Sequence, residues 1–212
     1  LIRNLDTRWE WYPQPGEVIS LGVFAKFFDD PIERVFVFQA GGNPELSFAN
    51  AASARNYGVE AEVRKSLALL AGGLRSFTVF ANATVMHSRI TPGSDSLSAA
   101  TASERPMTGQ SDYMVNAGLG YGNASGSVSA TLLYNVVGRR ISEAAPRPLP
   151  DTYEEARHQL DATLQVQPWT NWRVRLDGRN LLDSPYRFTQ GDVLRLRYKS
   201  GRQVALGFGW NL

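Results

Sequence analysis

The sequence predicts an all-β fold, an antiparallel segment of a transmembrane β-barrel. Three observations support this prediction. Apolar and polar residues alternate with a period of two in nine separate segments, the connections between these segments alternate in length, and tryptophan is confined to the ends of some of them. A helix would scatter the apolar residues around its surface, whereas a strand collects them on one face.

The nine segments share one pattern, with apolar residues on one face and polar or small residues on the other. They cover residues 4–11, 19–27, 56–64, 76–85, 113–121, 127–137, 159–167, 172–179 and 203–212. Leu133 and Val137 are exceptions, because they fall on the polar side of their segment. The alternation predicts nine antiparallel strands, each with one apolar face.

The connections between the strands alternate between short and long. The short ones lie at 12–16, 68–73, 122–126 and 168–171, and the long ones at roughly 30–53, 88–108, 141–156 and 186–202. In outer-membrane barrels the short turns are periplasmic and the long loops are extracellular. The pattern therefore predicts four periplasmic turns and four outer loops.

Tryptophan placement helps to distinguish a membrane barrel from a soluble one. A soluble β-sandwich or lipocalin-like barrel also alternates, so periodicity alone leaves both open. The five tryptophans all belong to the short-turn end of the predicted sheet: Trp9, Trp11, Trp169, Trp172 and Trp210. An interfacial aromatic girdle has this arrangement, which favours a membrane barrel with its periplasmic rim at these residues.

Composition narrows the class of protein further. The charge is nearly balanced, with 22 basic and 20 acidic residues, and cysteine is absent, which argues against nucleic-acid binding and excludes thiol chemistry. No apolar run approaches the ~20 residues of a membrane helix. The chain begins without a signal peptide or an initiator methionine, so we expect it to start within a longer protein.

No catalytic, cofactor or metal site is predicted. His87 with Ser88 could suggest a hydrolase, but no Ser-His-Asp spacing accompanies them, and we interpret His87 as a residue where a strand meets a long loop. His158 could bind a metal but fits a solvated strand start better. Arg139 and Arg140 could contact lipopolysaccharide or simply lie at the outer rim.

Five segments resemble the late barrel of TonB-dependent outer-membrane receptors. They are residues 4–35, 56–67, 105–121, 132–141 and 178–192, in the familiar order. Barrels of that family have about twenty-two strands around an N-terminal plug. The resemblance implies that residues 1–212 form the C-terminal portion of one such barrel, about its last nine strands, with the plug and earlier strands absent.

The resemblance also implies a function and a set of partners. It implies a receptor of the Gram-negative outer membrane that takes up a scarce nutrient by TonB-coupled transport, not an enzyme, with no cofactor and no nucleic-acid partner. The implied partners are outer-membrane lipid, the protein's own plug and N-terminal strands, TonB through the missing N-terminal region, the barrel-assembly machinery and a small nutrient. The alternatives are an ungated porin or adhesin-like barrel, a soluble β-sandwich binding module and, least favoured, a hydrolase barrel.

The final strand resembles the insertion signal of this family. Gly207 is followed by alternating apolar residues that include Trp210 and Leu212. The family usually ends in Phe, whereas this chain ends in Leu.

Charged residues on the polar faces predict a lumenal wall. They are Glu60, Glu62, Arg64, Asp161, Arg173, Arg175, Asp177 and Arg179. A lipid-facing Arg or Lys at mid-depth costs ~2–4 kcal/mol, so we expect these side chains to face the lumen. Because the family places its plug there, we interpret the wall as plug-contacting, with simple solvation of the lumen as the alternative. Nine strands also leave two unpaired edges, so we expect the segment not to close by itself.

Overall fold

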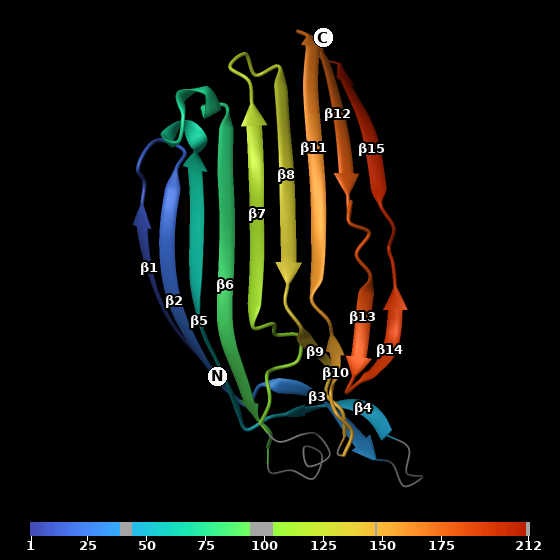
Figure 1. Ribbon diagram of the computed structural model, residues 1–212. Coiled ribbons are helices and arrows are strands. Elements are labelled where there is room, and N and C mark those ends of the chain that lie inside the picture. Colours follow the sequence, from blue (N-terminus) through green and yellow to red (C-terminus); the bar gives the residue numbers. More distant parts are fainter. Residues whose placement is uncertain (39–43, 94–103, 147, 211–212) are drawn as a thin grey trace.

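The computed structural model describes residues 1–38, 44–93, 104–146 and 148–210 as one strongly curved antiparallel sheet with smaller sheets at one end (Figure 1). The nine strands of the large sheet run in the order β1-β2-β5-β6-β7-β8-β11-β12-β15. Their bounds are β1 Ile2–Trp11, β2 Val18–Asp29, β5 Ser53–Ser66, β6 Phe77–Thr91, β7 Tyr113–Gly122, β8 Val128–Val137, β11 Arg157–Trp169, β12 Trp172–Arg179 and β15 Gln203–Trp210. Each predicted segment corresponds to one of these strands, which confirms the all-β prediction.

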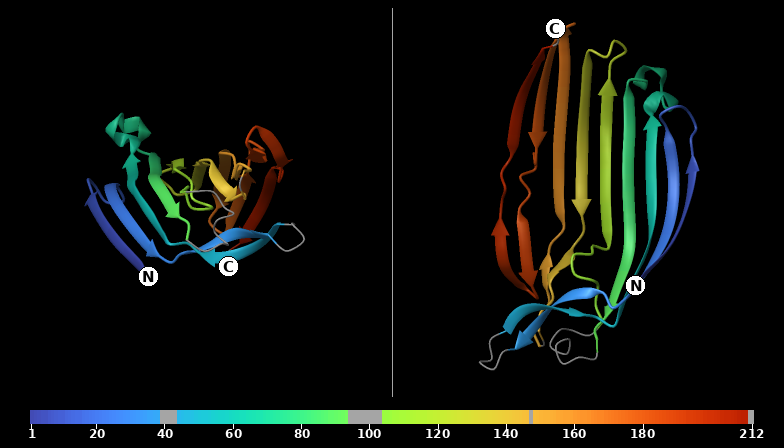
Figure 2. Two further views of the ribbon diagram at one scale, coloured as in Figure 1. Left: turned by 90° about the horizontal axis from the view of Figure 1, so that it is seen from below. Right: turned by 180° about the vertical axis from the view of Figure 1, so that it is seen from behind.

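The sheet does not close. Strands β1 and β15 are its two edges, and no described strand pairs with the outer side of either. The sheet bends into a trough, and the β3–β4 hairpin crosses the open side of the trough at the loop end (Figure 2). The expectation of an open barrel segment is therefore confirmed.

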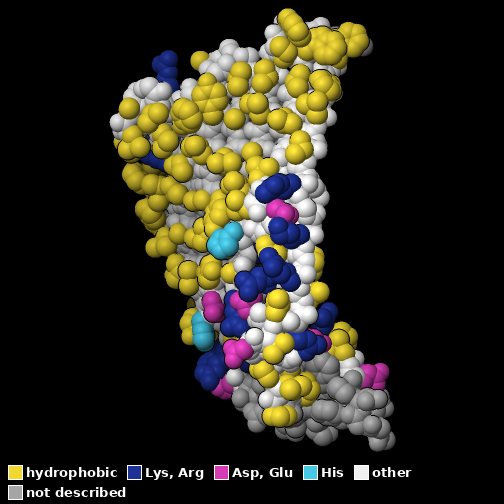
Figure 3. Space-filling view, turned by 45° about the vertical axis from the view of Figure 1, so that its right-hand side comes forward, with side chains coloured by type: hydrophobic (Ala, Val, Ile, Leu, Met, Phe, Trp, Pro, Cys, Tyr) yellow, Lys and Arg dark blue, Asp and Glu magenta, His cyan; other side chains and the backbone are white. Residues whose placement is uncertain are grey.

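The pairing register extends the alternation into two continuous faces. On the apolar face, one row of directly paired residues runs Val79, Leu119, Leu132, Ala162, Gly178 and Val204 across six strands. Many of these apolar side chains are exposed, for example Val204 at 73% and Leu132 at 44%. Hydrophobic side chains cover much of the surface of this face in Figure 3. A wide exposed apolar face is typical of a sheet whose solvent on that side is lipid.

The short turns all lie at the end of the sheet opposite the hairpin. The second of them, predicted as a simple turn at 68–73, contains two 3-10 helices, η1 Leu67–Leu69 and η2 Gly72–Leu74. Ser66 begins η1, where its hydroxyl accepts a hydrogen bond from the Ala68 N–H.

The long loops differ from the prediction, because most of them contain further strands. A two-stranded hairpin, β3 Ile32–Phe38 and β4 Pro44–Asn50, occupies the first loop. A four-stranded sheet, ordered β14-β13-β10-β9, combines the third and fourth loops through β9 Arg140–Glu143, β10 Thr152–Glu154, β13 Tyr186–Gln190 and β14 Val193–Tyr198. Strand β6 also continues to Thr91, so residues 88–91 are strand and not loop. These strands are shorter than most strands of the large sheet, and the pairing of β10 with β13 joins two different loops, so local alternation did not reveal them.

The small apolar core lies at the loop end. Ala51, Ala54 and Ile90 are buried together, with Phe28 and Met107 packed against them. This core anchors the base of the β3–β4 hairpin to strands β5 and β6.

Over the described part of the chain, the structure has no helix with the length and apolar character needed to cross a membrane.

Candidate functional site: the polar wall and the loop cavity

The polar face of the large sheet forms what we call the polar wall, the face opposite the apolar row described above. At its N-terminal side, Arg8 donates hydrogen bonds to Glu10 at 2.6 Å and to Glu62 at 2.8 Å. The guanidinium thereby connects β1 to β5 across the intervening β2. Glu62, predicted as a lumenal charge, thus has a partner within the wall. Its neighbour Glu60 has no ion pair among the described residues.

Three asparagines form a ladder across the middle of the wall. Asn82, Asn116 and Asn135 are direct partners on β6, β7 and β8. The Asn116 amide donates to the Asn82 Oδ1 at 2.8 Å, and the Asn135 amide donates to the Asn116 Oδ1 at 2.6 Å. The ladder stiffens the wall with neutral groups. Sequence reasoning missed it, because only the register shows that the three residues are aligned.

On the C-terminal side, several predicted charges bond to one another. Arg175 donates two hydrogen bonds to Asp177, at 2.7 and 2.9 Å, and Thr163 donates a third at 2.7 Å. Arg173 and Arg179 lie on the same face of β12, are exposed, and form no ion pair with any described residue. The wall therefore combines internally matched charges with unmatched cations.

Asp161 has a structural partner. Its carboxylate accepts a hydrogen bond from the backbone N–H of Asn180 at 2.8 Å. Asn180 is buried, has a positive φ of 52°, and donates through its amide to the Gly201 carbonyl at 2.7 Å. This pair holds the end of β12 against β11 and the loop before β15. No local pattern in the sequence indicates this role for Asn180.

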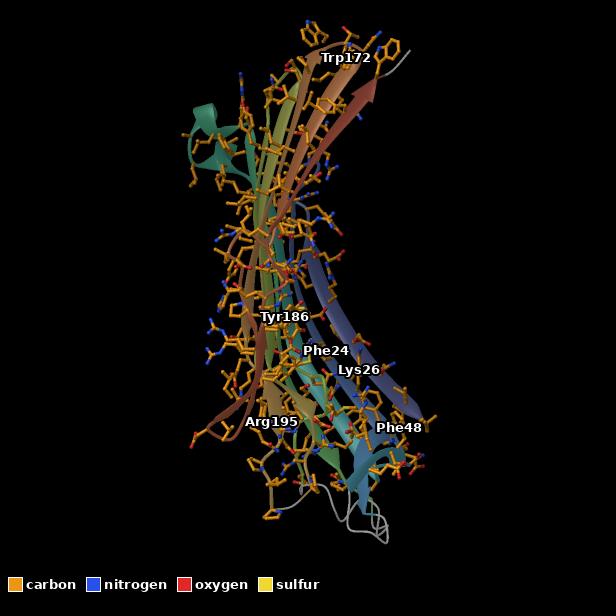
Figure 4. All side chains as sticks on the ribbon, turned by 90° about the vertical axis from the view of Figure 1, so that its right-hand side faces the viewer. Phe24, Lys26, Phe48, Trp172, Tyr186 and Arg195 are labelled. Carbon is orange, nitrogen blue, oxygen red and sulfur yellow. The ribbon has the colours of Figure 1, made fainter. Side chains whose placement is uncertain are left out.

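Two aromatic rings lie over glycines on the wall. Phe80 covers Gly118, where a Cβ would come within 2.2 Å of the ring, and the Arg64 guanidinium lies 5.7 Å from the ring centre. Phe24 likewise covers Gly58, with Lys26 nearby, as Figure 4 shows for the two labelled side chains. A Cβ at Gly118 would displace the Phe80 ring, and a Cβ at Gly58 would meet both the Phe24 ring and the Val85 carbonyl oxygen.

A buried ion pair fixes the β3–β4 hairpin over the end of the wall. Arg105 donates to Glu33 at 2.9 Å, and each side chain is 7% exposed. Thr108 donates a further hydrogen bond to Glu33 at 3.2 Å. Because breaking a buried pair leaves an uncompensated charge, this contact holds the hairpin in one position.

An open cavity of about 470 Å³ lies beside this ion pair. Arg34 and Phe48 of the hairpin line one side, and Arg140 and Glu154 line the other. Arg140 donates two hydrogen bonds to Glu154, at 3.0 and 2.8 Å. The cavity is thus lined mainly by charged and polar side chains, with one aromatic side chain from the hairpin.

The two histidines lie on different strands of the large sheet. His87 lies within β6 against the Tyr57 ring at 5.3 Å, so its prediction as a strand-end residue is wrong, because β6 continues four residues further. His158 lies near the start of β11 beside Tyr134. Within the described ranges, no three His, Cys, Asp or Glu side chains group closely enough to hold a metal ion.

The five tryptophans lie at the short-turn end of β1, β11, β12 and β15. Trp172 and Trp210 are cross-strand partners with stacked rings 6.2 Å apart, and Trp172 is labelled at this end in Figure 4. Trp169 pairs with Trp172, while Trp9 and Trp11 pair with residues of β2. Their role as a membrane-interface girdle stays a prediction. So does the insertion signal, whose Gly207 faces Arg175 and whose Leu212 lies outside the described residues.

A curved, open antiparallel sheet with an exposed apolar face, a polar wall and folded loops at one end is the architecture of an outer-membrane barrel segment. Residues 2–181 match the family model described as the TonB-dependent receptor-like β-barrel. The chain belongs to this family. Its members are transport receptors of the Gram-negative outer membrane and not enzymes, which places this segment in that membrane.

Solved structures show the same fold. The chain is similar to the FrpB iron transporter from Neisseria meningitidis, F3-3 variant, with 15% identity, a TM-score of 0.66, and coverage of 99% of this chain and 30% of that one. The ferric-catecholate import receptor Fiu from E. coli K12 is 14% identical, with a TM-score of 0.68 and coverage of 99% and 27%.

The ferric yersiniabactin uptake receptor FyuA from Yersinia pestis is 16% identical, with a TM-score of 0.66 and coverage of 99% and 30%. The chain therefore spans less than a third of the length of these receptors. The comparison with curated proteins gives no match.

Proposed function

We propose that this chain is the C-terminal portion of the barrel of a receptor that imports a scarce nutrient by TonB-coupled active transport. The match of residues 2–181 to the receptor barrel family carries the proposal. The nutrient class is a ferric chelate. In support, the three similar structures named above are described as an iron transporter, a ferric-catecholate import receptor and a ferric yersiniabactin uptake receptor.

The polar wall contacts the plug of the full receptor. Arg173, Arg179 and Glu60 support this role, because they project from the wall without ion-pair partners in the described residues. Hydrated contacts between such charges are individually weak, at ~0–1 kcal/mol each, which suits a domain that must be displaced during transport. Arg175 and Asp177 contribute less to this contact, because they bond to each other.

Uptake by whole cells tests the proposed function. Cells that carry the full-length receptor under iron limitation should accumulate labelled iron from a ferric chelate, and loss of TonB should abolish the accumulation. Uptake that persists without TonB would favour an ungated porin. Binding to the cell surface without uptake would favour an adhesin-like barrel, and recovery of the protein in the aqueous phase on detergent partition would favour a soluble module.

The double substitution Arg173→Gln and Arg179→Gln in the full-length receptor tests the contact with the plug. We expect the plug to unfold or become protease-accessible at lower denaturant concentration, because two of its charge contacts are removed. Arg75→Gln is the control, since Arg75 is an exposed arginine in a short turn away from the wall. Unchanged plug retention and unchanged transport would favour simple lumen solvation.

A further inference from the structure

The outer surface of the small four-stranded sheet carries an excess of arginine. Strands β13 and β14 place Arg187 directly opposite Arg197. Both side chains are exposed, and neither has a carboxylate partner among the described residues. Two like charges in direct opposition destabilise a strand pair. An anion bound from outside the chain would remove this cost.

The direction of these two side chains follows from their neighbours. Arg157 lies on the polar wall, where it donates to Gln159 at 2.9 Å, and its guanidinium covers the Tyr186 ring at 4.2 Å. Tyr186 stacks on its cross-strand partner Tyr198, with ring centres 4.7 Å apart. Because neighbouring residues in a strand point to opposite faces, Arg187 and Arg197 point away from the lumen.

The same outward row continues onto β10 and the segment before β9. The backbone N–H of Glu155 donates to the Arg187 carbonyl at 2.9 Å, which places the two residues side by side. The Glu155 carboxylate lies 3.2 Å from the Arg139 Nε and also accepts a hydrogen bond from Thr189. The one carboxylate of this row is therefore occupied by Arg139. We call Arg139, Arg187 and Arg197 the outer arginine strip.

The strip lies at the depth of the outer lipid headgroups. About nine to eleven residues of tilted strand cross the hydrocarbon core. Counted back from Trp210 at the short-turn end, this distance ends near residues 199–201. The apolar outward positions of β15 end at Val204, and Arg202 and Lys199 follow before Arg197. In Figure 3, Lys and Arg side chains appear beside and below the apolar surface, toward the loop end.

We infer that the outer arginine strip binds the phosphate groups of the phosphorylated lipid in the outer leaflet. Arginine suits this partner, because its planar fork matches two phosphate oxygens and it stays charged at all physiological pH values. The strip needs at least two anionic oxygens to match Arg187 and Arg197. A headgroup whose acyl chains lie on the apolar face below supplies them at the required depth.

Lipid binding by the full-length receptor tests this inference. The receptor is delipidated and reconstituted in neutral phosphatidylcholine, and binding of diphosphoryl lipid A is then titrated. Each arginine near an anionic surface contributes about 1 kcal/mol. Arg187→Gln with Arg197→Gln should therefore weaken binding about 30-fold. Arg187→Lys with Arg197→Lys keeps the charge but not the planar fork, so it should weaken binding by less than the Gln pair.

Arg75→Gln is the control, because it removes an exposed arginine from a short turn at the end of the large sheet opposite the loops. Lipid binding should be unchanged in this control. Equal lipid A binding by wild type and the Arg187→Gln, Arg197→Gln variant would overturn the inference. So would equal competition by inorganic phosphate at the same phosphate concentration, since the strip would then be a site for free phosphate. These outcomes do not depend on TonB or on iron uptake, so they are distinct from a failure of the proposed function.

Discussion

Replacing Leu132 by arginine tests whether the apolar face of the sheet lies against lipid. Leu132 is 44% exposed and pairs with Leu119 on β7 and Ala162 on β11. It lies four residues from Val128 at the start of β8, or about 14 Å along the strand at ~3.4 Å per residue. With a strand tilt near ~45°, this places it about 10 Å into an apolar belt about 25 Å tall.

An arginine near the middle of this belt should destabilise the folded barrel by ~2–4 kcal/mol. At about 1.4 kcal/mol per tenfold, this corresponds to a change of about 30- to 700-fold in the equilibrium constant for folding. The measurement is denaturant-induced unfolding of the full-length receptor in lipid vesicles, read as the shift of the midpoint at constant slope.

Thr131→Arg is the matched control, one residue away on the same strand. Thr131 lies on the polar wall, paired with Gly120 and Thr163. It should tolerate a charge with little loss of stability. If Thr131→Arg destabilised the receptor as much as or more than Leu132→Arg, the assignment of the two faces would be wrong.

Two further predictions concern the wall and a turn. Gly118→Leu should lower the denaturation midpoint by the equivalent of ~1–3 kcal/mol, because its Cβ would overlap the Phe80 ring. Gly120→Ala should cost much less, because the nearest neighbour of its Cβ would lie 3.7 Å away. Equal losses of stability in the two variants would contradict this packing. The Lys65 ammonium and a backbone N–H lower the pKa of Glu17 in the folded protein. The ionised carboxylate therefore stabilises the fold at pH values above its ordinary pKa of about 4.3. This stabilisation should be lost as the pH falls through the lower pKa of the folded state. Stability measured against pH should show this acid-dependent loss in the wild type and a smaller one in Glu17→Gln, and identical profiles would refute the role of this ion pair.

Much of the candidate site could be predicted from the sequence, but its internal pairing could not. Alternation placed Arg173, Arg175, Asp177 and Arg179 on one face, because side-chain direction in a strand depends only on sequence parity. It could not distinguish Arg175, which is matched by Asp177, from Arg173 and Arg179, which have no such partner. That difference depends on side-chain geometry at each position.

Local patterns in the sequence are enough to predict the nine long strands, their two faces and the positions of the short turns. These features follow from local rules, namely a period of two and the residues that form turns. Even the location of all five tryptophans at one end follows from their distance to the short turns.

The contacts between residues of different strands and loops, by contrast, emerge only from the three-dimensional arrangement of the chain. The asparagine ladder requires the registers of three strands, and the Glu33–Arg105 pair joins residues 72 positions apart. The outer arginine strip likewise exists because β13 and β14 pair in one register and share a sheet with β10. Such contacts depend on how separate segments are aligned in space, and a local pattern contains no information about that alignment.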